Sequence, residues 1–578
     1  MKLVTTRNKN GDEHYYVSHS FINDKGKSTS KTVRKLGTLF ALQEELGLDK
    51  AGVIAWCKEQ VKLDTKKYDE ENKACSITVS PTKKIDSDKT NCYSVGYLIL
   101  QSIYYKLRLP NTCRRIKRNT KCEYDLNAIL KDLIYARVLQ PCSKLSTYKA
   151  CQSFIEKPNY ELHDIYRALS LLAENLYDIQ SDVYKNSNFI NKRNTAVLYY
   201  DCTNYYFEIE QEAGMRKYGK SKEHRPNPIV QMGLFMDYDG IPLGFDLFSG
   251  NENEQPSLKN IQTQIMKDYD INHFVVCTDA GLGSMANREF NNLNGRAFIT
   301  TQSLKKLDAK SKKWLFEESI WKKLGTDEEF KIEDIQELHK LPDAVYYKEQ
   351  PYKNDKITNH KLIVTYSTKY ARYQKKIRDQ QVNRANKIID SGVKISKGRS
   401  NQNSPMQYIS VVNCTEDGEV ADQERANINN ELIDEAATYD GLYGICTNLE
   451  DDVKNIIGVS ERRWEIEECF RIMKTDFEAR PVYLSRDDRI KAHFMTCVLA
   501  LIFLRVIEKQ LDYKYTAPEI IRTLRDMKVH KIEGLGYMPI FTRTKLTDDL
   551  LRIYELDLDY EVIKNKKMRE IIKKSKEI

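Results

Sequence analysis

Residues 229–248 read IVQMGLFMDYDGIPLGFDLF, and this stretch decides the fold. Two apolar runs, Ile229 to Met236 and Ile241 to Phe248, flank the polar sequence Asp237-Tyr238-Asp239-Gly240. Apolar runs of this length on either side of an Asp/Gly-containing turn are typical of a β-hairpin. The stretch therefore predicts two antiparallel strands joined by a tight turn.

Working outward from the hairpin, the neighbouring segments alternate between strand and helix patterns. An apolar run before the hairpin ends at Asp201, and a later strand ends next to Asp279. The predicted elements are a strand at 196–200, the hairpin, a helix at 257–267, a strand at 274–277, a helix at 286–293 and a strand at 297–300. The order β-β-β-α-β-α-β predicts an α/β fold with a mixed sheet and flanking helices.

Other patterns surround this block. Residues 1–90 predict a small α+β region with a strand around His14 to Val17, a helix around Phe40 to Leu63 and a linker over 64–90. Helical spacing of apolar residues marks 91–190 as a helical region with a basic cluster at 114–121. The first part of the sheet region covers 191–302, and 303–432 is a Lys/Glu-rich insertion with a loop at 398–401. Residues 433–510 return to the core pattern, and 511–578 predict a polar helical tail.

The composition limits the classes of protein to which the chain can belong. The chain has 578 residues, of which 41% are hydrophobic and 30% charged, with a net charge of +9. This fits a protein of several domains that binds a polyanion, although it also fits a Lys-rich protein without such a partner. The 13 cysteines are scattered without zinc spacing or a disulfide pattern. The polar start does not resemble a signal peptide, and the apolar run from Phe494 to Leu504 is too short to span a bilayer.

Three acidic residues form the candidate catalytic constellation. If the first and fourth strands of the sheet are neighbours, Asp201 and Asp279 converge at their ends, and Glu467 on a later helix completes a triangle. Carboxylates suit hard divalent cations such as Mg²⁺ or Mn²⁺. Two such ions can activate a nucleophile and stabilise a leaving oxygen in phosphoryl transfer.

The helix predicted from Ser460 to Lys474 carries a further pattern. At about 100° per residue, Arg463, Glu467 and Lys474 lie on one face, whereas Glu465 and Glu468 do not. This face presents a cation, a carboxylate and a cation, so that Arg463 and Lys474 could grip phosphates beside Glu467.

These residues carry a resemblance to a known family. The segment is similar to the Tyr-x2-Arg-x3-Glu-x6-Lys signature of bacterial insertion-sequence DDE transposases, in the insertion-sequence-four-like branch, with Ser460 where the family has Tyr. The similar segments elsewhere are 137–144, 200–208, 219–226, 240–243, 249–251, 279–282 and the helix from 490. Together they cover most of residues 90–510.

The resemblance implies a ribonuclease H-like (retroviral integrase-like) core interrupted by the insertion, with catalytic and metal-binding Asp201, Asp279 and Glu467. It also implies that the helical region at 91–190 binds DNA. It implies metal-dependent cleavage at element ends and transfer of the 3′-hydroxyl into target DNA, with two Mg²⁺ (or Mn²⁺) ions. The expected partners are double-stranded DNA, as ends and target, and a second copy of the chain, with no membrane, in the bacterial cytoplasm on the nucleoid. The candidate DNA-binding residues are Arg463, Lys474, His224, Arg225 and Lys222.

Two rival functions use the same residues. One is a ribonuclease H-like nuclease that cuts DNA without strand transfer, and the other is an inactive, DNA-binding derivative of a transposase. In the insertion, Trp314 and Trp321 could stack on an unpaired base, although core packing is the simpler reading. The basic helix from Thr368 to Ile389 could line a DNA channel or form a solvated surface.

Overall fold

A computed structural model of the chain describes residues 1–8, 11–22, 28–71, 81–82, 84, 87, 89–317, 319–331, 342–352, 357, 359–391, 404–414 and 420–577. The chain forms two compact units, Met1–Lys89 and Thr90–Ile578. The loop predicted at 398–401 and most of the predicted linker beyond residue 71 lie outside the described residues.

The first unit is a three-stranded antiparallel sheet packed against two helices. Its elements are β1 (Lys2–Arg7), β2 (Glu13–Ile22), β3 (Ser28–Thr38), α1 (Leu39–Leu46) and α2 (Lys50–Glu71). Tyr15, Leu42 and Val53 form the centre of its core. The single helix predicted around 40–63 is two helices, because Gly47 ends α1 in the left-handed conformation with φ of 65°. The linker predicted from residue 64 is also wrong in its first part, since α2 continues to Glu71.

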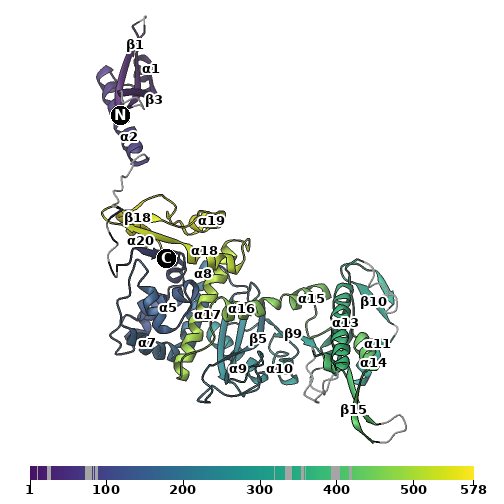
Figure 1. The fold of residues 1–578 in the computed structure, drawn as a ribbon. Coiled ribbons are helices and arrows are strands. Elements are labelled where there is room, and N and C mark those ends of the chain that lie inside the picture. The colour runs from purple at the N-terminus through teal and green to yellow at the C-terminus, as the bar shows by residue number, and fades with distance from the viewer. Residues whose placement is uncertain are drawn as a thin grey trace. The chain divides into compact units, whose positions relative to one another are not determined.

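The second unit is built on a ten-stranded sheet in the order β11-β10-β12-β13-β16-β9-β8-β5-β6-β7. Strands β10, β9 and β5 of this sheet are labelled in Figure 1. The strands of this sheet that come first along the chain are β5 (Val197–Tyr206), β6 (Ile229–Asp237), β7 (Pro242–Ser249), β8 (Val275–Thr278) and β9 (Ala297–Gln302). The predicted hairpin is confirmed as β6 and β7, which pair antiparallel. Strands β5, β8 and β9 run parallel to one another; the helix α9 (Gln255–Tyr269) connects β7 to β8, and α10 (Met285–Phe290) connects β8 to β9.

One strand differs from its prediction. We expected the first strand of the block to end at Asp201, but β5 continues to Tyr206. The reason lies in its partner, because β6 pairs with β5 along its whole length, from Leu198 opposite Asp237 to Tyr206 opposite Ile229. Asp201 therefore lies within a strand.

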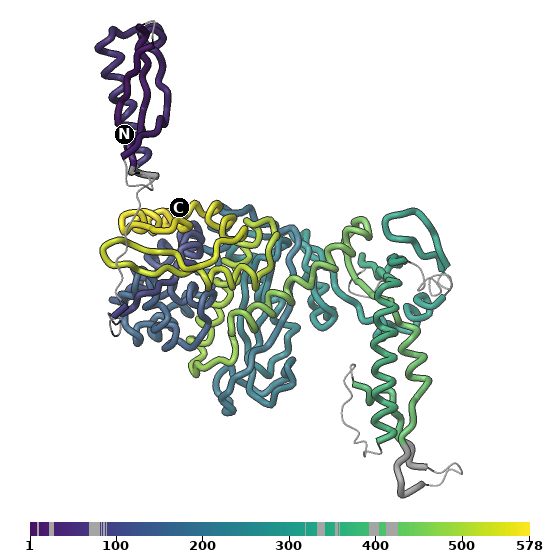
Figure 2. Tube along the Cα trace, turned by 45° about the horizontal axis from the view of Figure 1, so that its top comes forward, coloured from purple at the N-terminus to yellow at the C-terminus, as the bar shows by residue number. Residues whose placement is uncertain are grey.

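The insertion extends the same sheet beyond β9. Its strands β10 (Ile320–Lys323), β11 (Glu329–Lys331), β12 (Val345–Pro351) and β13 (Lys361–Ser367) join the core through β16 (Leu442–Thr447), which pairs with β9. A second hydrophobic cluster, including Trp321 and Leu362, lies here. The other elements are α11 (Ala309–Phe316), α13 (Thr368–Asp390), β14 (Ile409–Cys414), β15 (Val420–Ile428) and α14 (Asn430–Ala437). Helix α13 and β15 contact each other and run side by side in Figure 2.

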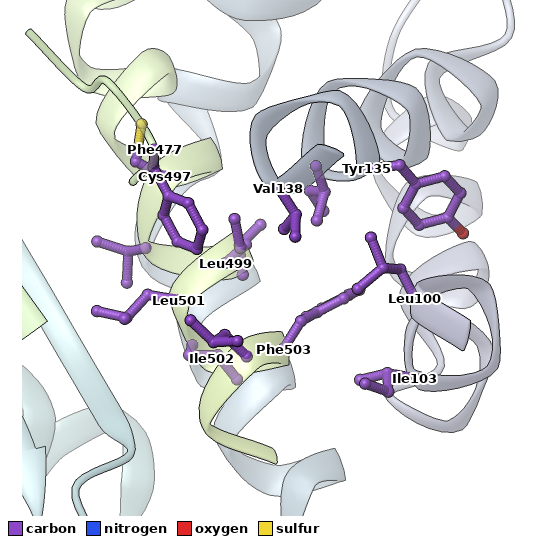
Figure 3. Packing of buried hydrophobic residues seen from close by; sticks show 14 of the residues in the cluster. Leu100, Ile103, Tyr135, Val138, Phe477, Cys497, Leu499, Leu501, Ile502 and Phe503 are labelled. Carbon is purple, nitrogen blue, oxygen red and sulfur yellow. The ribbon is translucent and has the colours of Figure 1, made fainter. Parts of the chain in front are cut away.

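A long apolar helix, α17 (Asp487–Gln510), joins the helical region to the sheet region. It contacts α5 and α7 on one side and α16 (Trp464–Thr475) and β7 on the other. Figure 3 shows Leu499 and Phe503 of α17 packed towards Val138 of α5 and Leu100 of α3. This helix is long and apolar enough to cross a membrane, but 94% of its most apolar window is buried inside the fold. The apolar residues of α17 therefore belong to the core of this unit.

The helical region consists of α3 (Tyr97–Lys106), α4 (Leu109–Arg118), α5 (Leu126–Leu139), α6 (Lys144–Cys151), α7 (Leu162–Glu174) and α8 (Leu176–Ile190). The helical tail predicted over 511–578 is wrong in part. Its helices α18 (Ala517–Asp526), α19 (Lys545–Tyr554) and α20 (Asn565–Lys574) alternate with β17 (Lys528–Ile532), β18 (Gly536–Pro539) and β19 (Ile563–Lys564). Strand β17 pairs with β4 (Cys92–Ser94), a partner so distant in sequence that no local pattern reveals it.

Candidate active site

Asp201 and Asp279 are brought together by the register of two parallel strands. Strand β5 pairs with β8 so that Tyr199 lies opposite Cys277, and each aspartate follows two residues later. The carboxyl groups are close enough for the charge of Asp279 to act on Asp201. Burial and then Asp279 raise the pKa of Asp201 to about 6, against the lowering effect of Lys222 and Arg463. The first and fourth strands of the block are thus neighbours, which was the condition for the two aspartates to converge.

Both aspartates are held by backbone amides. Asp201 Oδ1 accepts a hydrogen bond from its neighbour Cys202 N at 2.7 Å, and Asp279 Oδ1 accepts one from Leu282 N at 2.9 Å. Gly281 lies inside the turn that Asp279 makes. A Cβ atom on Gly281 would come within 3.3 Å of Asp279 Oδ2, so a side chain there crowds the carboxylate.

The segment that carries Glu467 is two helices rather than the one predicted from Ser460 to Lys474. Helix α15 (Val453–Glu461) ends just before Arg463, and Arg463 caps the start of α16. The buried face of α16 follows Ile466, which lies in the core, so Glu467 on the next position faces outward with a 60% exposed side chain. The break places Arg463 at the first turn of α16, one turn below Glu467.

Arg463 faces all three candidate carboxylates. Its Nη1 lies 3.6 Å from Glu467 Oε1, and its side chain is only 21% exposed. Burial lowers the pKa of Arg463, but Tyr443 and the three acids outweigh this effect and raise the pKa above its ordinary value. Arg463 Nε is buried without a hydrogen-bond partner. The positive charge of Arg463 therefore acts on all three acids, and its contact is with Glu467.

The two other acids of α16 are engaged elsewhere. Glu465 Oε1 accepts from Arg462 at 2.8 Å, and Glu468 pairs with Arg471 at 2.7 Å. Only Glu467 is directed to the arginine that faces the aspartates.

Lys222 lies beside Asp201. Its ammonium donates to Cys202 O at 2.5 Å and pairs with Glu254 at 3.3 Å. Burial lowers the pKa of Lys222, but Asp201 and Glu254 outweigh this effect, so the pKa is raised overall. Asn204 ties the loop to β5, since its amide donates to Lys220 O and its oxygen accepts from Lys222 N.

A second cationic cluster lies at the far end of β5. Lys474 and Arg480 both reach Glu223 Oε1, at 3.2 and 3.1 Å. The guanidinium of Arg225 lies 4.3 Å from the centre of the Tyr206 ring, and that of Arg480 lies 5.4 Å from it. Neighbouring His224 is exposed and has a φ of 56°.

Two features of this cluster escaped the sequence argument. Glu223 and Arg480 belong to no charge pattern that could be seen along the chain, because the loop at 207–228 and the segment after α16 meet only in the fold. Lys474 is not directed to Glu467, which lies two helical turns away, but to Glu223.

The candidate metal ligands are the carboxylates of Asp201, Asp279 and Glu467. The described residues contain no group of three or more His, Cys, Asp or Glu side chains close enough to share one ion. The donor set nevertheless fits a hard cation, because two half-buried, aligned carboxylates repel each other and the nearby cations Lys222 and Arg463 lower the pKa of Asp201. The two aspartates thus supply two of the three candidate carboxylate ligands, whereas the third, Glu467, is paired with Arg463.

The aromatic and basic candidates of the insertion are largely structural. Trp321 is fully buried, as the packing interpretation predicted. The ammonium of Lys348 lies 4.5 Å from the Trp314 ring centre and 4.9 Å from that of Trp321. On α13, Arg378 is buried and pairs with Asp440 at 2.5 Å.

Comparison with known proteins gives one informative match. A family model described as "Transposase DDE domain" matches residues 207–503, just over half of the chain. The matched span includes Asp279 and Glu467, and Asp201 precedes it. No curated protein matches the chain. A cryo-EM structure of the piggyBac transposase synaptic complex with hairpin DNA is similar over 83% of each chain, with 8% identity and a TM-score of 0.34, too low to carry an argument.

Proposed function

Because the chain belongs to the transposase DDE-domain family, we propose that it is the transposase of a bacterial insertion sequence. The proposed activity is cleavage at the ends of the element and transfer of the resulting 3′-hydroxyl to target DNA. The spacing of Arg463, Glu467 and Lys474 supports assignment to the insertion-sequence-four-like branch. The observation that carries the proposal is the parallel register that sets Asp201 beside Asp279.

We propose a ribonuclease H-like core formed by 191–302 and 433–510 and interrupted by the insertion at 303–432. The strand order β7-β6-β5-β8-β9 supports it, since a three-stranded antiparallel meander continues into two parallel strands. The helical region at 91–190 is proposed to bind DNA, with a second copy of the chain on the paired ends.

Members of the family generally use divalent metal ions, and Asp201, Asp279 and Glu467 are the residues proposed to hold two Mg²⁺ or Mn²⁺ ions here. When bound, such ions supply the positive charge that activates an attacking oxygen and stabilises a leaving one. The role of the protein itself is to keep the two aspartates aligned and to free Glu467 from Arg463. Rotation of the exposed Glu467 side chain would break its contact with Arg463.

The cations next to the acids are proposed to bind the DNA backbone. Arg463 and Lys222 lie near the aspartates, and Lys474 lies roughly 16 Å from Arg463 along α16, at ~1.5 Å per residue. That spacing is sufficient for separate phosphates of one strand. Arg225 and His224 lie exposed beside Lys474 and extend the same surface.

The decisive experiment compares wild type with Asp201→Ala on labelled DNA that carries the element ends, with Mg²⁺ or Mn²⁺. We expect the variant to bind the ends and to cut none. Undiminished cutting by Asp201→Ala contradicts the assignment. Pre-cleaved ends then separate the rivals, because nicking without joining identifies a nuclease, and binding without any cleavage by wild type identifies an inactive derivative.

A further inference from the structure

A cavity of about 400 Å³ lies between the α5–α6 connection and the segment that joins α16 to α17. Its wall carries more cationic or basic side chains than acidic ones, and Glu478 is the one carboxylate among its lining residues. The polar lining includes Arg137, Lys144, Arg480, His493, Ser143 and Ser146. These residues come from segments far apart in the sequence, so only the fold assembles the cavity.

Lys144 is buried here without an anionic partner. It is only 5% exposed, and no ion pair to it occurs within the described ranges. Its ammonium contacts His493 Nδ1 at 3.5 Å. Burial holds the pKa of His493 well below its ordinary value, so the ring is neutral. The ring then donates from Nε2 to Ala479 O at 3.1 Å and offers Nδ1 to Lys144.

Arg137 places a second buried cation beside Lys144. It is 4% exposed, and among the described residues its hydrogen bonds go to neutral carbonyls, those of Phe477, Glu478 and Cys142. Its Nε is buried without a hydrogen-bond partner. Burial and the charge of Arg137 lower the pKa of Lys144 to about 7. Two buried like charges without a counter-charge are unfavourable, and an anion in the cavity removes that cost.

The start of helix α6 adds to the positive potential. Ser143 caps α6, and its hydroxyl accepts from Ser146 N at 3.3 Å. The N-terminus of a helix carries a partial positive charge and favours phosphate groups. Ser143, Lys144 and Ser146 all line the cavity, so the helix start and both buried cations act on the same space.

The cavity adjoins the cationic cluster of the candidate active site. Arg480 lines it and also reaches Glu223 Oε1, which Lys474 shares. A row of cations therefore leads from the aspartates to the cavity, in the order Lys222, Lys474, Arg480 and Lys144.

We propose that this cavity binds a phosphate of the DNA backbone, through Lys144, Arg137 and the start of α6. The proposal deepens the proposed function and rests on it for the identity of the ligand. The bound phosphate belongs to the strand whose other phosphates contact Lys474 and Lys222.

The test uses Lys144→Met, with Lys149→Met as matched control because Lys149 is an exposed lysine on the same helix. Binding of duplex element ends is measured by fluorescence anisotropy over a salt series, without divalent ions, in the Asp201→Asn background. We expect Lys144→Met to bind at least tenfold more weakly, with the slope of log K against log salt reduced by about 0.9. Lys149→Met should keep the wild-type slope. An unchanged slope for Lys144→Met overturns the proposal.

A second measurement separates this proposal from the proposed function. Inorganic phosphate should raise the Tm of wild type but not that of Lys144→Met, whether or not the protein cuts DNA. Without phosphate, Lys144→Met should melt no lower than wild type, since it loses an uncompensated buried charge. A lower Tm with an unaltered slope identifies a structural lysine. A phosphate-dependent Tm with an unaltered slope identifies a site for a free anion, and either result contradicts the proposal.

Discussion

Arg463 Nη1 lies 3.6 Å from Glu467 Oε1, and the charge of the same guanidinium lowers the pKa of Asp201. The charge of Arg463 therefore offsets part of the mutual repulsion of the three acids. A divalent cation held by the same acids would leave Arg463 available for a phosphate.

Asp201→Asn should stabilise the metal-free protein at neutral and alkaline pH. Burial raises the pKa of Asp201 from 3.8 to about 6 in the folded state. Ionisation of this carboxyl thus disfavours folding, a cost absent below about pH 4 that grows to at most about 3 kcal/mol above pH 6. Thermal melts in a chelator should show a Tm a few degrees higher for the variant at pH 8 and no difference at pH 4.

The exposed Asp327→Asn serves as control for this experiment and should leave Tm unchanged at both pH values. Added Mg²⁺ should raise the Tm of wild type and should not raise that of Asp201→Asn, because the variant lacks one carboxylate of the proposed site. A lower Tm for Asp201→Asn at pH 8 without metal would contradict the predicted cost.

Gly281→Ala should impair cleavage more than it impairs folding. The added Cβ lies 3.3 Å from Asp279 Oδ2, so the carboxylate must shift by a few tenths of an ångström. We expect cleavage of element ends to fall at least tenfold, with a loss of about 1 kcal/mol in unfolding free energy. The matched control is Gly458→Ala in α15, where a Cβ meets no atom within 4 Å. It should stabilise the protein by up to about 1 kcal/mol, and equal cleavage by both variants would refute the prediction.

Glu223→Gln should strengthen DNA binding. Glu223 neutralises Lys474 and Arg480 at 3.2 and 3.1 Å, and its removal frees two cations for phosphates. We expect a several-fold lower Kd at low salt and a steeper salt dependence, whereas Lys474→Met should weaken binding. Glu252→Gln, a change of an exposed acid, is the control. Weaker binding by Glu223→Gln would show that Glu223 chiefly positions Lys474.

Arg193→Met should destabilise the second unit strongly. Arg193 Nε lies 2.5 Å from Asp237 Oδ2, with both side chains at most 1% exposed, and Arg193 also donates to Ile241 O and Pro242 O. It thereby ties the β6–β7 turn to α8. Removing one partner of such a buried pair costs about 3–5 kcal/mol. Denaturant unfolding should show this loss, and the control Arg167→Met, which breaks an exposed pair, should stay within about 0.5 kcal/mol of wild type.

The sequence by itself determined the local elements and the chemistry they carry. Apolar runs located β6, β7, β8 and β9, helical spacing located α9, α13 and α17, and the stripe on α16 distinguished Glu467 from its neighbours. Such periodic patterns are local because each face of a strand or helix must be buried or solvated along its own length.

The tertiary structure alone decided which segments meet. It continues β5 past Asp201, aligns Asp201 with Asp279, breaks the helix before Arg463 and pairs β4 with β17. It also turns Lys474 to Glu223 and buries Lys144 beside Arg137. Register and packing depend on the partner across the sheet or core, which lies far away along the chain, so the residues of one segment alone do not specify them.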